Sequence, residues 1–116
     1  MNKKTDKQET ALELTGKQTR YLRGLGHGME AKVIVGREGL SDNLLKSAKD
    51  TLLAHELIKV KLGPNCPLNK KEAAEQLAQK TSAAMVQLIG KTILLYRPNP
   101  ELKKKEQIRI PSKKKE

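Results

Sequence analysis

The spacing of hydrophobic positions between residues 14 and 98 changes period several times. Apolar residues recur every three to four positions in three segments, which predicts amphipathic helices over residues 16–26, 41–54 and 70–82. Shorter segments rich in Val, Ile and Leu, bounded by turn residues, predict strands over residues 31–35, 57–62, 85–89 and 92–97. The predicted order along the chain is therefore α-β-α-β-α-β-β.

Turn and capping residues support these boundaries. Thr15 and Gln18 form a capping-box pattern at the start of the first helix, and Asn69 and Glu72 form another at the third. Gly90 begins a two-residue connection typical of a tight hairpin. One stripe of the first helix is predicted to face the core, and it contains Leu14, Gln18, Tyr21, Leu22 and Leu25.

Strand-helix-strand connections of these lengths produce parallel, right-handed units, and the terminal hairpin adds an antiparallel strand. The sequence thus predicts a single small α/β domain with a four-stranded mixed sheet. Because strand side chains alternate between faces, Ile58, Val60 and Leu62 should face the core. Lys59 and Lys61 then share the opposite face.

The two flanks have a different composition from the segment between them. Residues 1–13 are predicted to be a flexible polar arm, residues 14–98 the folded domain, and residues 99–116 a basic, largely disordered tail. One exception is Gln107 to Ile110, whose alternating pattern before Pro111 is compatible with a short edge strand.

The excess of basic residues indicates the kind of partner. The chain has a formal charge of +11, and residues 16–98 alone contain 14 basic and 7 acidic residues, a net charge of +7. Such an excess attracts polyanions, so nucleic acid is the leading candidate. Cys66 is the only cysteine and no run approaches the ~20 apolar residues of a membrane span. We therefore expect a cytoplasmic monomer with no membrane partner.

The segment from Gly36 to Gly39 connects the first predicted strand to the second helix. Two glycines let the backbone approach a phosphate, and the first turn of the helix offers unpaired N–H groups at the positive end of its dipole. Arg37 can add a bidentate phosphate contact, whereas Glu38 opposes one. A strand-to-helix turn with two glycines is also ordinary geometry, so the loop alone does not identify a binding site.

Other short motifs do not indicate catalysis. Gly90 to Thr92 resembles the end of a P-loop but lies in a hairpin, and Gly24 to Gly28 resembles a dinucleotide fingerprint but closes a helix. Neither His27 nor His55 has a metal-ligand spacing with Cys66, and no carboxylates are paired. The sequence predicts no enzyme activity, no metal and no cofactor, although His27 lies where it could touch a phosphate.

Only Tyr21 and Tyr96 are aromatic, so base stacking on a sheet is not the expected mode of binding. Contacts to phosphate and sugar are more plausible. The residues predicted to make them are Gly36, Arg37, Glu38 and Gly39 in the loop, and Lys17, Arg20, Arg23, Lys59, Lys61, Lys91 and Arg97 elsewhere.

Four segments together resemble the CRM domain family, most closely its stand-alone YhbY-like bacterial members. The segments are Leu14 to Gln18, Val35 to Leu40, His55 to Lys61 and Gln87 to Arg97. The resemblance covers about residues 12 to 98. It implies a fold similar to the C-terminal domain of translation initiation factor three, with the Gly-x-x-Gly loop taking part in RNA binding.

The resemblance also implies association with precursors of the large ribosomal subunit and their ribosomal RNA. Members with repeated domains in plant organelles assist intron splicing, so an RNA chaperone or splicing factor is one alternative. A general DNA-binding or nucleoid protein is a second, and an enzyme acting on phosphorylated substrates is a third. Comparable affinity for duplex DNA at equal salt would favour the nucleoid protein.

Overall fold

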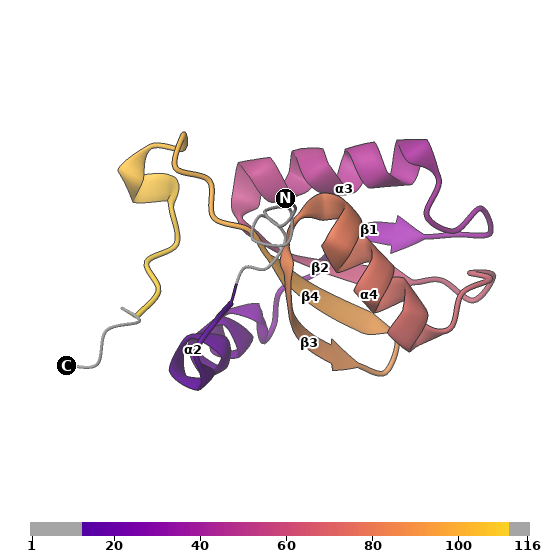
Figure 1. Ribbon diagram of the computed structural model, residues 1–116, viewed down its shortest axis with the longest axis horizontal. Helices are drawn as coiled ribbons and strands as arrows, with labels where there is room; N and C mark the ends of the chain where they lie inside the picture. Colours follow the sequence, from indigo (N-terminus) through magenta and orange to yellow (C-terminus); the bar gives the residue numbers. More distant parts are fainter. Residues whose placement is uncertain (1–12, 112–116) are drawn as a thin grey trace, which may run out of the picture.

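The computed structural model describes residues 13–111, and the expected polar arm lies almost wholly outside this range. Figure 1 shows a four-stranded sheet with helices on both of its faces. The predicted α-β-α-β-α-β-β order is confirmed, and a short 3-10 helix follows it. The elements are α2 (Gly16–Gly26), β1 (Ala31–Val35), α3 (Asp42–His55), β2 (Leu57–Leu62), α4 (Lys70–Thr81), β3 (Ala84–Ile89), β4 (Thr92–Tyr96) and η1 (Lys104–Glu106).

The sheet is mixed, as predicted, with the strand order β1-β2-β4-β3. β1 pairs with β2 in parallel, whereas β4 is antiparallel to both β2 and β3. The hairpin between β3 and β4 pairs Ile89 with Thr92, and Gly90 adopts a φ of 58°, which glycine reaches without steric cost. The final strand therefore lies in the interior of the sheet.

Side-chain caps fix where the three α-helices within residues 13–111 begin. Thr15 and Gln18 form the predicted capping box, with the two hydrogen bonds at 3.1 and 3.0 Å. Ser41 Oγ accepts a bond from the Leu44 amide at 3.1 Å. Asn69 Oδ1 accepts one from the Glu72 amide at 2.8 Å, which is one half of the predicted second box. Caps of this kind each contribute about 1 kcal/mol.

One face of the sheet packs against α3 and α4 and forms the larger core. The predicted alternation along β2 is confirmed, because Ile58, Val60 and Leu62 all lie in this cluster. Its other buried members are Val33, Val35, Ala48, Leu52, Ala73, Ala74, Leu77, Ala83, Ile93 and Leu95. Two helices side by side therefore close this face.

The opposite face packs against α2 alone and forms a smaller cluster, which contains Leu22, Leu57, Val86, Leu94 and Tyr96. α2 comes so close to the sheet that a Cβ on Gly26 would lie 2.8 Å from a Leu94 methyl group. The prediction that Tyr21 and Leu25 are buried is wrong, since they are 41% and 39% exposed. The buried residues of α2 are Gln18, Leu22 and Gly26, so the helix touches the sheet along one line and leaves Tyr21 and Leu25 to its side.

Residues 99–111, part of the tail predicted from the sequence, contact the domain at several points. The buried Glu56 carboxylate accepts hydrogen bonds from the backbone amides of Asn99, at 2.7 Å, and Ile108, at 2.5 Å. The side-chain amide of Gln18 donates to the Pro111 carbonyl at 2.7 Å. Ile108 and Ile110 add apolar contacts with the cluster.

The edge strand suggested for Gln107 to Ile110 does not form. The Ile108 amide, which a strand would use for pairing, instead donates to Glu56. Glu56 itself has a φ of 65°, and its carbonyl accepts a bond from the Arg97 amide at 2.8 Å. A single residue between α3 and β2 therefore holds both the end of β4 and the segment beyond it.

Candidate nucleic-acid interface

The loop from Gly36 to Gly39 forms one tight turn between β1 and α3. The Gly39 amide donates to the Gly36 carbonyl at 3.0 Å, and Gly39 has a φ of 64°, which accounts for the glycine there. Gly36 has open space where a side chain would stand, and Arg37 and Glu38 are exposed. The loop can thus bring its backbone close to a ligand.

Three connections meet at this end of the sheet, on the right in Figure 1. The Gly63 amide donates to the Val35 carbonyl at 2.9 Å, which joins the ends of β1 and β2. The Leu62 amide donates to the Lys91 carbonyl at 2.8 Å, which adds the hairpin turn. α3 and α4 both begin at this edge, so the unpaired N–H groups of two helices lie there.

We call this end of the sheet the loop edge; it consists of the Gly36–Gly39 turn, the hairpin turn at Lys91 and the first turns of α3 and α4. It contains both predicted and unpredicted basic residues. Arg37 and Lys91 were predicted, whereas Lys70 and Lys71, exposed at the start of α4, were not. The sequence contained a signal for them, because parallel strands end at one edge and the helices that follow them begin there. Three carboxylates, Glu38, Asp42 and Glu72, oppose these cations in or next to the same first turns.

The predicted lysines of β2 do lie on the face opposite the larger core. Lys61 is exposed and Lys59 is half-buried. Lys61 stands beside Ile34 of β1 in the strand register, and Ile34 is 62% exposed. α2 therefore leaves part of this face open to solvent.

A hollow of about 450 Å³ lies between the C-terminal end of α2 and this open part of the sheet. It brings together Arg23 and Lys59, two predicted site residues that are far apart in the sequence. The lining residues are Arg23, Gly24, Gly26, His27, Lys59, Gln87, Ile89, Thr92 and Leu94. No residue of this lining is acidic.

The remaining predicted residues lie elsewhere. Lys17 and Arg20 are exposed on the N-terminal half of α2. The Arg97 guanidinium donates to the Thr81 carbonyl at 3.1 Å, so it joins the end of β4 to the end of α4. The eleven predicted residues are thus divided between the loop edge, the hollow with its neighbour Lys61, the start of α2 and the Arg97 contact.

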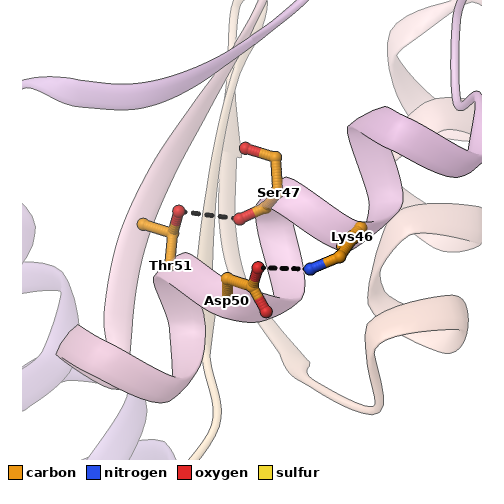
Figure 2. Close-up of polar contacts among 4 residues, drawn as sticks. All are labelled: Lys46, Ser47, Asp50 and Thr51. Carbon is orange, nitrogen blue, oxygen red and sulfur yellow. Dashed lines mark hydrogen bonds and ion pairs between the residues drawn. The ribbon is translucent and has the colours of Figure 1, made fainter.

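The outward face of α3 provides a contrast, because two of its charged side chains form an ion pair. Figure 2 shows Lys46 Nζ 3.0 Å from Asp50 Oδ2, and Thr51 donating to the Ser47 carbonyl at 2.7 Å. Both ends of the ion pair are well exposed, which limits its contribution to about 0.5 kcal/mol. Lys46 is therefore a suitable control for the unpaired cations.

Neither tyrosine offers a strand-borne stacking platform. Tyr96 is only 3% exposed, and burial, with a smaller contribution from the Glu56 carboxylate, raises the pKa of its phenol. Tyr21 is on α2. Within residues 13–111, no cluster of His, Cys, Asp and Glu is arranged to hold a metal, and no helix is long and apolar enough to cross a membrane.

Known proteins match both the sequence and the fold. Residues 14–97 match the CRS1 / YhbY (CRM) domain. The Bacillus subtilis protein named "Probable RNA-binding protein YqeI" is 42% identical over 98 residues, covering 84% of this chain and 99% of its own. A Haemophilus influenzae protein named "RNA-binding protein" is 37% identical over 100 residues, covering 86% of this chain and 97% of its own.

A solved structure agrees with these matches. The solution structure of SAV1595 from Staphylococcus aureus has a TM-score of 0.70 and 42% identity, and the match covers 85% of this chain and all of that one. The protein is thus of the class of small α/β domains that have a mixed sheet and, here, basic residues at the loop edge. The chain belongs to the CRS1/YhbY (CRM) family, as its sequence motifs indicated.

Proposed function

We propose that this protein binds structured RNA, and that it does so on precursors of the large ribosomal subunit without catalytic turnover. The observation that carries the proposal is the loop edge. There the Gly36–Gly39 turn with Arg37, the hairpin turn with Lys91 and the starts of two helices lie at one end of the sheet. Relatives named as RNA-binding proteins support the choice of RNA as the polyanion.

Contacts to the RNA backbone fit this surface better than base stacking. Helix N-termini and exposed cations bind phosphates, and such contacts position a protein on folded RNA without reading its sequence. The buried ring of Tyr96 is not accessible to bases. Recognition at the loop edge would therefore depend on the shape of the RNA and on salt concentration.

A charge-matched pair of variants tests the loop edge. Lys91→Gln and Lys46→Gln each remove one lysine charge, from the loop edge and from the outward face of α3 respectively. We expect Lys91→Gln, and likewise Arg37→Gln, to weaken binding and to reduce the salt slope by about one. Fluorescence anisotropy with a fragment of large-subunit ribosomal RNA measures both quantities. Equal effects of Lys91→Gln and Lys46→Gln would contradict a role for this edge.

Crosslinking in cells, followed by sequencing of the attached nucleic acid, tests the ribosomal part of the proposal. Recovery of mainly precursor ribosomal RNA supports it. A spread over messenger RNAs would instead indicate a general RNA chaperone, and recovery of DNA would indicate a nucleoid protein. Competition between structured RNA and duplex DNA at one salt concentration separates the last case in vitro.

A further inference from the structure

The hollow beneath the end of α2 has the features of a second binding site. We propose that it holds one unpaired nucleotide of the bound RNA, with the phosphate near Arg23 and Lys59 and the base against Ile89. This inference rests on the proposed RNA-binding function, and it adds a preference for RNA with a bulged or looped-out nucleotide.

The size of the hollow suits such a ligand. Its volume of about 450 Å³ lies in the range of ~300–1,000 Å³ that is usual for small-molecule sites. It is also open on one side, as a nucleotide that stays attached to its neighbours in a chain requires. α2 contributes two glycines to the wall, and no atom lies within 4 Å of the position of a Cβ on Gly24.

The charge of the hollow favours an anion. Arg23 comes from α2 and Lys59 from β2, so the two cations approach the space from different elements. The loop edge has acidic side chains among its cations, whereas the lining of the hollow has none. A phosphate held between Arg23 and Lys59 would therefore meet no carboxylate in that lining.

The rest of the lining suits a base better than it suits a free phosphate. Ile89 is 61% exposed and offers an apolar side chain that the flat face of a base can cover. The side chains of His27, Gln87 and Thr92 make no hydrogen bond to other residues in the range 13–111, so their donors and acceptors remain available to base edges. Single-stranded bases are read in this way, on edges that a duplex conceals.

Two RNA hairpins of equal length test the proposal, one fully paired and one with a single bulged 2-aminopurine nucleotide. We expect the full-length protein to bind the bulged hairpin about two- to tenfold more tightly, the equivalent of about one added hydrogen bond. Quenching or enhancement of the 2-aminopurine fluorescence on binding would report the changed surroundings of that base. Equal affinity for the two hairpins overturns the proposal.

Two uncharged variants locate the effect in the hollow. Gln87→Ala and Thr92→Val each remove one polar side-chain group from the lining of the hollow. Each should abolish most of the preference for the bulge and leave the affinity for the paired hairpin unchanged. A preference that survives in both folded variants overturns the proposal, and if one of them fails to fold, the other still decides.

The loop-edge variant separates this inference from the proposed function. Arg37→Gln should weaken binding of both hairpins by the same factor. If it does so while the wild-type protein binds the two hairpins equally, the nucleotide site in the hollow is refuted and RNA binding at the loop edge is supported.

Discussion

The two faces of the sheet differ in how completely they are covered. α3 and α4 close one face over a cluster of thirteen buried residues. α2 and residues 99–111 cover only part of the other, over five buried residues, and Ile34 and Ile89 stay exposed there beside the β2 lysines. The closed face stabilises the fold, and the partly open face leaves cations and apolar side chains accessible to a ligand.

Removal of a core side chain from the closed face should give the largest effect. Leu77 is fully buried in the larger cluster, so Leu77→Ala should lower the free energy of unfolding by about 2–5 kcal/mol. Ile34→Ala on the open face should change it by no more than about 0.5 kcal/mol. Urea denaturation measures both, and similar losses would contradict the contrast between the faces.

A variant of Glu56 tests how much the hydrogen bonds to residues 99–111 stabilise the fold on the second face. Glu56→Gln keeps the volume but replaces one acceptor oxygen with an amide that cannot accept. One of the amides of Asn99 and Ile108 then loses its acceptor, and we expect a loss of about 1–3 kcal/mol. Hydrogen exchange at these two amides should also accelerate. Glu101→Gln, at an exposed carboxylate of the same segment, is the control and should have little effect on either measurement.

The phenol of Tyr96 gives a pH-dependent test of the smaller cluster. Burial raises its pKa above the ordinary value of 10.0, with a further contribution from Glu56. Above about pH 10 the unfolded chain releases this proton while the folded protein retains it, so stability falls as the pH rises towards the folded pKa. Below that pH the group has no effect. In Tyr21→Phe, where Tyr96 is the only tyrosine, phenolate absorbance should appear with a midpoint above 10.0.

The smallest effect is expected on the outward face of α3. Asp50→Asn removes the ion pair with Lys46 that Figure 2 shows, and the free energy of unfolding should change by less than about 0.5 kcal/mol. The change should shrink further in high salt, because both groups are exposed. Urea denaturation at two salt concentrations measures it, and a loss comparable to that of Glu56→Gln would show that exposed charge pairs also hold this fold.

Local patterns predicted the elements, because the residues that determine them are close together in the sequence. Thr15 and Gln18 mark a helix start three residues apart, and the alternation of Ile58, Val60 and Leu62 assigns a strand and its faces. The motifs also indicated the CRS1/YhbY (CRM) family, to which the chain belongs. These signals depend on helix and strand geometry alone.

Contacts between distant segments were not predictable in the same way. The bonds of Glu56 to Asn99 and Ile108 span 43 and 52 residues, and no local pattern marks them. The exposure of Tyr21 depends on α2 being the only α-helix on its face of the sheet among residues 13–111. The hollow was missed for the same reason, since it exists only where the end of α2 crosses β2, β3 and β4.

The interior position of β4 has a consequence for the newly made chain. β4 is the last strand of the described residues, yet it separates β2 from β3. A nascent chain that ends before residue 92 has β1 and β2 with an open inner edge, and β3 has no partner. Unpaired strand edges favour aggregation. We therefore expect the sheet to close only after Tyr96 has been added to the chain, when the β3–β4 hairpin pairs with β2 as one unit.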